Sequence, residues 1–126
     1  MKKVVVVSGG FDPLHSGHIN LLRNAKSLGD TLIVILNSDE WLTAKKGRPF
    51  MPFDERATIL EHLDVVDNVF GGGDDDGSVC STLENIKKAY PPSNNHLIFA
   101  NGGDRGKDNI PEMSVEDYTF EFGVGG

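Results

Sequence analysis

Continuous apolar runs alternate with one-sided apolar repeats in the first part of the chain. VVVV at residues 4–7 and LIVIL at residues 32–36 are unbroken runs of β-branched and aliphatic residues, a pattern typical of strands covered on both faces in a parallel sheet. Between them, apolar residues recur every third position and predict a helix that ends near Gly29. Strand, helix and strand in this order predict a βαβ unit. The helical repeat consists of Ile19, Leu22, Ala25 and Leu28.

The middle of the chain predicts two more helices. FDERATILEHL at residues 53–63 carries apolar residues at helical spacing. A clearer repeat at residues 79–90 places Val, Leu, Ile and Tyr side chains on one helical face. We expect Ser78 to be the N-cap of this second helix, and Pro91 with Pro92 to end it.

Three further runs predict strands. HLIFA at residues 96–100 is continuous, VVDNVF at residues 65–70 is short, and residues 118–122 alternate aromatic and polar side chains, as in a strand buried on one face. We find no internal repeat and no linker, and therefore expect one domain over residues 1–126. Its expected fold is α/β: a Rossmann-like three-layer domain with a mostly parallel sheet of about five strands, which binds ligands beyond the carboxyl ends of the strands.

Composition narrows the class of protein. The chain has 126 residues, 38% of them hydrophobic, a formal net charge of −7 and one cysteine, Cys80. No apolar run approaches the ~18 residues of a membrane span, so we expect no membrane association. A lone cysteine excludes a disulfide framework within the chain and favours a cytoplasmic location. The acidic balance argues against a nucleic-acid partner, because duplex binding depends on many Lys and Arg contacts to phosphates.

The stretch GGFDPLHSGH at residues 9–18 lies between the first predicted strand and the first predicted helix, the position where α/β proteins bind ligands. Gly9 and Gly10 allow the backbone to approach a ligand closely, and Gly17 does the same in the first turn of the helix. Free N–H groups and a partial positive charge at a helix N-terminus favour an anion. The stretch therefore predicts a phosphate site.

Two histidines stand three positions apart at the start of this helix. We expect Ser16 to be the N-cap, which places His18 in the first turn and His15 just outside it, so that both imidazoles can face one anion. Asp12 cannot bind that anion directly, and we expect it to orient a histidine, hold a lysine or contact magnesium. The pair lacks the i, i+4 spacing of helical zinc ligands, and no third ligand is obvious nearby, so no protein-bound metal centre is predicted.

GGFDPLHSGH resembles the H-x-G-H signature of the nucleotidylyltransferase superfamily, which includes cytidylyltransferases and pantetheine-phosphate adenylyltransferases. Residues 29–69 are similar to the corresponding stretch of glycerol-3-phosphate cytidylyltransferases and heptose-1-phosphate adenylyltransferase domains. The similarity is close over roughly residues 3–70 and looser around residues 102–104. It implies transfer of CMP or AMP, from CTP or ATP, to a small sugar or polyol phosphate, with release of pyrophosphate. It also implies Mg²⁺ as cofactor and favours a homodimer.

The resemblance also assigns residues to the site. It implies that His15, His18 and Lys46 act in catalysis, with Lys46 reaching the β- and γ-phosphates from the basic segment AKKGRP at residues 44–49. The alternative for such a charge run is a solvated loop. The residues implied to bind the nucleotide are Gly9, Gly10, Phe11, Asp12, Gly17, Arg56, Gly103 and Asp104.

Three of the basic residues also have simpler interpretations. Arg56 matches the E-R pair of the superfamily, yet it could equally be a surface helix residue that bridges an Asp or Glu. Arg105 and Lys107 are the residues implied to bind the acceptor phosphate, and the alternative for them is a flexible charged loop.

The end of the sequence departs from the pattern of the superfamily. Members continue after the last strand with a Ser/Thr-rich motif that binds nucleotide phosphate, whereas this sequence stops at GVGG. Without those hydroxyl and N–H groups, we expect weaker triphosphate binding. The competing hypothesis is therefore a nucleotide-binding module without turnover.

Overall fold

A parallel sheet of five strands forms the centre of the computed structural model, which describes residues 1–12, 14–72, 79–101 and 115–122. The strand order is β3-β2-β1-β4-β5, and each pair of neighbours runs in parallel. This confirms the predicted Rossmann-like α/β fold. The strands are β1 (Lys2–Gly9), β2 (Thr31–Asn37), β3 (Asn68–Gly72), β4 (Asn95–Asn101) and β5 (Tyr118–Phe122).

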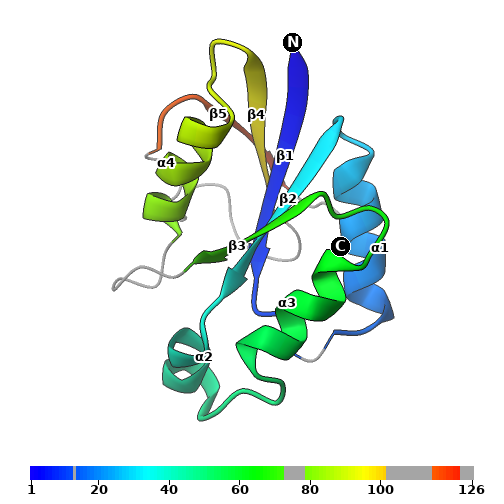
Figure 1. Ribbon diagram of the computed structural model, residues 1–126, viewed down its shortest axis with the longest axis vertical. Helices are drawn as coiled ribbons and strands as arrows, with labels where there is room; N and C mark the ends of the chain where they lie inside the picture. Colours follow the sequence, from blue (N-terminus) through cyan, green and yellow to red (C-terminus); the bar gives the residue numbers. More distant parts are fainter. Residues whose placement is uncertain (13, 73–78, 102–114, 123–126) are drawn as a thin grey trace.

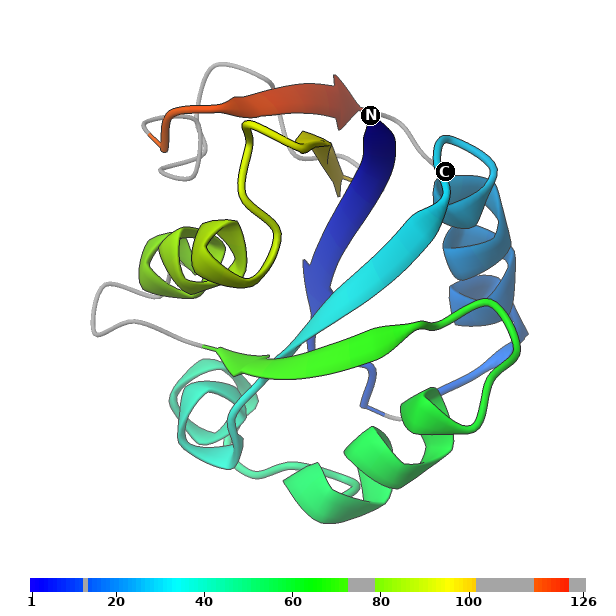
Figure 2. The same cartoon turned by 45° about the horizontal axis from the view of Figure 1, so that its top comes forward.

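Helices cover both faces of the sheet and make three layers. In Figure 1, α1 and α3 lie on one side of the strands and α4 lies on the other, while α2 sits at the end toward which the strand arrows point. The tilted view in Figure 2 shows the same separation. The helices are α1 (Ser16–Lys26), α2 (Asp39–Lys46), α3 (Phe53–Glu61) and α4 (Cys80–Ala89).

Alternation along the central strands divides the core into two halves. Val4 and Val6 pack in the cluster that contains Leu83 and Ile86 of α4. The alternate residues of the same strand pack against Leu22 of α1 and the neighbouring helix α3. Because fully burying one such side chain contributes roughly 1.5–3 kcal/mol, the unbroken apolar runs require cover on both faces. No helix in the described residues is long and apolar enough to cross a membrane.

The order in which successive strands are added to the sheet reverses between β1 and β4. These two strands are neighbours in the sheet, although β2 and β3 separate them in the chain. Val6 of β1 pairs with Phe99 of β4, so the carboxyl ends of these two strands lie side by side. The strand order β3-β2-β1-β4-β5 therefore has a topological switch point between β1 and β4. The turn after β1 and the start of α1 therefore stand where α/β sheets bind ligands.

Several element boundaries differ from the predictions. The N-cap of α1 is His15, not Ser16, and the N-cap of α4 is Val79, without a side-chain hydrogen bond. Ser78 itself lies outside the described residues. The strand predicted at residues 65–70 starts later, because Asp67 uses its carboxylate, 2.8 Å from the Leu32 amide nitrogen, to accept that N–H at the sheet edge.

Helix α2 is an element that the apolar pattern does not predict. Its N-cap is Ser38, whose hydroxyl oxygen accepts the Trp41 N–H at 3.0 Å. Asp39 and Glu40 follow in the first turn, where the helix dipole favours negative charge. The helix includes Lys46, so the basic segment is helical in its first half rather than a loop throughout.

Candidate functional site

The two histidines form a capping box at the start of α1. His15 Nδ1 accepts the Gly17 N–H at 3.1 Å, and His18 Nδ1 accepts the His15 N–H at 3.2 Å. A capping box is usually built from Ser or Thr with Glu or Gln. Here two imidazoles satisfy the same backbone donors, which fixes both rings against the helix terminus.

These hydrogen bonds determine which ring nitrogen carries the proton. A neutral imidazole that accepts at Nδ1 holds its proton on Nε2. His15 and His18 therefore each present an Nε2–H donor, and their ring centroids lie 4.0 Å apart at an interplanar angle of 31°. His15 is exposed and His18 is half-buried. Two donors beside a helix N-terminus form an environment that suits an anion.

Burial, with the positive charge of His15 as a second cause, lowers the pKa of His18 below its ordinary value of 6.5. The unfolded chain therefore binds a proton at this residue before the folded chain does. The contribution of His18 to stability is complete above the ordinary pKa and falls as the pH drops through and below it. The ring is consequently neutral at pH 7.

We predict that ring ¹⁵N NMR at pH 7 will show the Nε2–H tautomer for His18, with a titration midpoint below 6.5. His62 provides an internal control, because its Nδ1 lies 2.7 Å from the Thr58 carbonyl oxygen and must donate to it. His62 should therefore show the Nδ1–H tautomer. An Nδ1–H form of His18 would contradict the capping box.

Phe11 packs against His18, one residue of the histidine pair. Its ring is buried and meets the His18 ring edge-on, with centroids 5.0 Å apart. Phe11 has a φ of 49°, a backbone conformation that costs a non-glycine residue about 1–3 kcal/mol. A Cβ at Gly9 would lie 3.1 Å from the Phe11 ring, and one at Gly10 would lie 2.9 Å from the Leu42 side chain. Both glycines therefore make room for protein side chains.

Gly17 is required by the position of the His15 ring. A Cβ there would lie 2.9 Å from His15 Cε1 and 3.1 Å from Nδ1, closer than such contacts allow. We predict that Gly17→Ala will displace this ring but leave the thermal midpoint almost unchanged, because the cost of the lost cap, about 0.5–2 kcal/mol, offsets the roughly 1 kcal/mol by which alanine favours helix. NMR shifts of the His15 ring and calorimetry will test this. Asn20→Ala, at an exposed position of α1, is the matched control.

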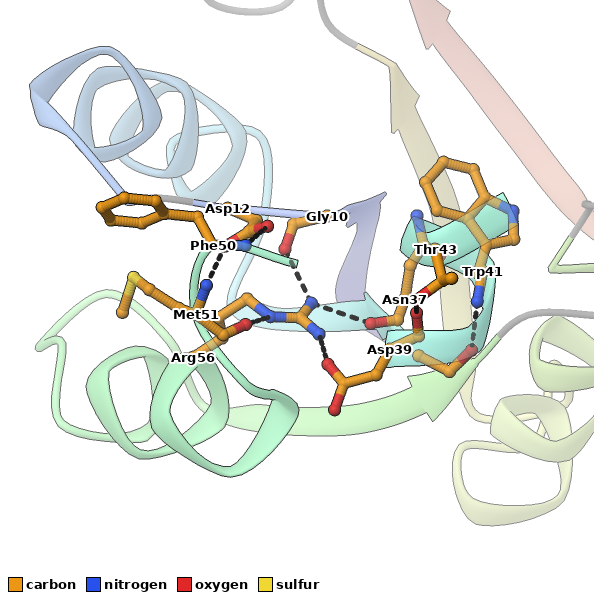
Figure 3. Close-up of polar contacts among 10 residues, drawn as sticks. Gly10, Asp12, Asn37, Asp39, Trp41, Thr43, Phe50, Met51 and Arg56 are labelled. Carbon is orange, nitrogen blue, oxygen red and sulfur yellow. Dashed lines mark hydrogen bonds and ion pairs between the residues drawn. The ribbon is translucent and has the colours of Figure 1, made fainter. Parts of the chain in front are cut away.

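Asp12 holds a distant segment of backbone. Its two carboxylate oxygens accept the N–H groups of Phe50 and Met51 at 2.6 and 2.5 Å (Figure 3). None of the three roles expected for Asp12 from the sequence anticipates this pair of contacts. They join the turn before the histidines to the segment between α2 and α3.

Arg56 of α3 is fully buried, so the alternative of a surface helix residue is wrong. Its guanidinium donates to the carbonyl oxygens of Gly10, Asn37 and Met51 at 2.8–2.9 Å and forms an ion pair with Asp39 at 2.7 Å (Figure 3). The ends of β1 and β2 are thereby fixed to α2 and α3. The predicted role of Arg56 in nucleotide binding stays a prediction. Because the side chain is buried, any such role is indirect and consists of holding the backbone of Gly10, Asn37 and Met51 in place.

The remaining predicted residues are only partly placed. Lys46 is the last residue of α2, and Arg48 follows it at an exposed position. The side chain of Lys46 is outside the described part of the chain. Four further predicted residues, in the stretch that follows β4, are also outside it: Gly103, Asp104, Arg105 and Lys107.

The described residues do not build a metal site of their own. Within them, no group of three or more His, Cys, Asp or Glu side chains could hold a metal ion. Both Asp12 oxygens accept backbone N–H groups, and Asp39 binds Arg56. We therefore derive no chemistry from a metal held by these side chains.

A pocket of about 530 Å³ lies at the carboxyl ends of β2 and β3. The histidine pair is not part of its lining. One buried polar atom, Asn37 Oδ1, has no hydrogen-bond partner in the part of the chain that the structure describes. The sequence analysis missed both features. A usable signal was the Asn37-Ser38 pair directly after the apolar run of β2. The described residues that line the pocket are Ser38, Phe53, Gly71, Gly72, Ser81, Thr82 and Asn85.

Comparison with known proteins identifies the family of this chain. A family model described as "Cytidylyltransferase-like" matches residues 6–118. The chain belongs to the cytidylyltransferase-like family. This confirms the resemblance to nucleotidylyltransferases that the H-x-G-H motif indicates. The matched region contains the histidine pair, the basic segment and Arg56.

Relatives of this cytidylyltransferase-like chain carry two kinds of name. FAD synthase of Pyrococcus abyssi is 48% identical over 88 residues, and FAD synthase of Thermococcus sibiricus is 41% identical over 109 residues. These matches cover 69% and 85% of this chain. The bifunctional protein HldE of Hahella chejuensis is 35% identical over 95% of this chain. The chain spans 57%, 68% and 24% of these relatives, in the same order.

A solved structure has the same fold. The lipopolysaccharide core biosynthesis protein of Thermoplasma volcanium superposes with a TM-score of 0.72 and 23% sequence identity, covering 97% of this chain and 96% of that one. At this identity the likeness concerns the fold alone. It supports the Rossmann-like α/β fold independently of the sequence matches.

Proposed function

We propose that this protein transfers a nucleotidyl group from a nucleoside triphosphate to a small phosphorylated acceptor and releases pyrophosphate. The observation that carries the proposal is the histidine pair. His15 and His18 present two Nε2–H donors at the N-terminus of α1, beyond the carboxyl end of β1. A triphosphate lying there meets donors whose orientation the capping box has already set.

The proposed reaction needs positioned donors more than it needs a strong base. An oxygen of the acceptor phosphate is anionic at neutral pH and attacks the α-phosphorus directly. A new O–P bond forms as the bond from the α-phosphorus to the bridging oxygen breaks, and pyrophosphate leaves with that electron pair. Charge grows on phosphate oxygens, where His15 and His18 donate. A preorganised donor of this kind is worth about 10²–10³ in rate.

We propose ATP as the nucleotide, with CTP as the alternative. FAD contains an adenylyl group, and two relatives are named FAD synthase. Mg²⁺ enters as the complex that it forms with the triphosphate, whose oxygens supply ligands. Lys46 approaches the β- and γ-phosphates, while Gly103 and Asp104 contact the nucleoside. A cytoplasmic homodimer that binds neither nucleic acid nor a membrane belongs to the same proposal.

The acceptor proposed here is a hydroxyl-rich phosphate such as a sugar or polyol phosphate. Among the described residues that line the 530 Å³ pocket none is charged, three carry a hydroxyl, one carries an amide and two are glycines. Asn37 pairs in the sheet register with Gly72, but it is buried and does not line the pocket, so the side chains of Ser38, Thr82 and Asn85 are the groups that can bind a ligand hydroxyl. Arg105 and Lys107 bind the acceptor phosphate.

A pyrophosphate-release assay tests the proposal. ATP and CTP are each paired with a sugar 1-phosphate, glycerol 3-phosphate and flavin mononucleotide, with Mg²⁺ present. We expect release with ATP and a polyol or sugar phosphate. Release only with flavin mononucleotide would refute the proposed acceptor but support the reaction. Tight ATP binding without release from any pair would instead support a binding module without turnover.

A further inference from the structure

The backbone of Met51 is held from both sides by charged groups of two different elements. Its N–H is 2.5 Å from Asp12 Oδ1, and its carbonyl oxygen accepts from Arg56 Nε at 2.9 Å. The same guanidinium also binds the carbonyl oxygen of Gly10, two residues before Asp12. Residues 10–12, Met51 and Arg56 thus form a closed ring of hydrogen bonds.

This ring joins two parts of the proposed site. Asp12 lies three residues before His15, in the turn that leads into α1. Met51 lies three residues after the exposed Arg48, in the segment that follows the basic end of α2. Hydrogen bonds to charged groups are stronger than those between neutral groups. The ring therefore limits how far the basic segment can move from the histidines.

We propose that Asp12 is a positioning residue, which holds the segment of residues 48–51 in a fixed place relative to the histidine pair. The inference rests on the proposed function. Asp12 uses both carboxylate oxygens on backbone N–H groups, so it acts on the triphosphate through Arg48 and the end of α2. A fixed cationic segment does not have to be ordered when the triphosphate binds, and this preserves affinity.

Asp12→Asn is the sharpest test, because it keeps the shape of the side chain. The asparagine offers one acceptor oxygen and turns an NH₂ donor toward the other backbone N–H. Residue-resolved amide exchange, measured without nucleotide, should become about 10- to 100-fold faster at Phe50 and Met51. Unchanged exchange at both amides would overturn the proposal.

Steady-state kinetics distinguish positioning from a merely structural role. We expect KM for the triphosphate to rise about 10-fold while kcat changes little, since the lost contacts act equally on ground and transition states. A smaller folded fraction would lower kcat and leave KM unchanged, and that outcome would overturn the proposal.

Asp30→Asn is the matched control. Asp30 is exposed and also accepts a backbone N–H, that of Lys3 at 2.8 Å, but it lies at the amino end of the strands, away from the histidine pair. It should change neither exchange at residues 50 and 51 nor KM. If the unaltered protein shows no turnover, the proposed function fails, while the exchange comparison still decides whether Asp12 holds the segment.

Discussion

Replacing His18 with glutamine is expected to lower kcat by about 10²–10³ while leaving the thermal midpoint nearly unchanged. Glutamine at this third helical position can still accept the N–H of the capping residue, as in an ordinary capping box. Its amide NH₂ can also donate, but the flexible glutamine side chain does not hold that donor in the fixed position of the imidazole Nε2–H. Activity and stability therefore separate in this variant, because the ring performs both tasks through different nitrogens.

His18→Ala is the companion variant. It removes the donor and the cap together, so it should lose the same activity and, in addition, about 0.5–2 kcal/mol of stability. Pyrophosphate release and calorimetry on the two variants measure both effects. If His18→Gln retained full turnover, the Nε2–H donors would not act in the reaction.

Most of the fold could be predicted, because burial on two faces leaves a strong trace in the sequence. The run VVVV of β1 supplies both halves of the core, and no polar residue interrupts it. A helix such as α2 leaves little trace, since Leu42 is the only buried residue among those whose side chains the structure describes in this helix. Its formation depends on the Ser38 cap and on the contacts of Asp39 rather than on an apolar stripe.

The contacts made by the candidate site residues could not be predicted from the sequence, and the roles of these residues stay predictions. The H-x-G-H spacing located the histidine pair, but nothing in a sequence says that imidazoles will cap the helix in place of Ser16. Arg56 shares a face of α3 with the buried Leu60, but its charge favours solvent, and its burial depends on the three carbonyl oxygens from separate segments that converge on it. Such convergence is set by tertiary structure and cannot be read from local pattern.

Replacing Arg56 is expected to have the second large effect, which is on the free energy of unfolding. Arg56→Met should lower the free energy of unfolding by about 3–5 kcal/mol, the usual cost of breaking a buried charged network. Methionine fills much of the space but offers no donor, so the carbonyl oxygens of Gly10, Asn37 and Met51 lose their partner. Asp39 contributes less, because its side chain is 40% exposed and water can replace the guanidinium.

Denaturant unfolding of Arg56→Met, Arg56→Lys and Arg23→Met will measure this. Arg23 is exposed on α1, so its replacement should stay within about 0.5 kcal/mol of the parent. Lysine keeps the charge at position 56, but its single ammonium cannot reproduce the planar fork that reaches several oxygens. We therefore expect Arg56→Lys to lie between the other two variants. If Arg56→Met were as stable as Arg23→Met, the buried guanidinium would not be what holds the strand ends to α2 and α3.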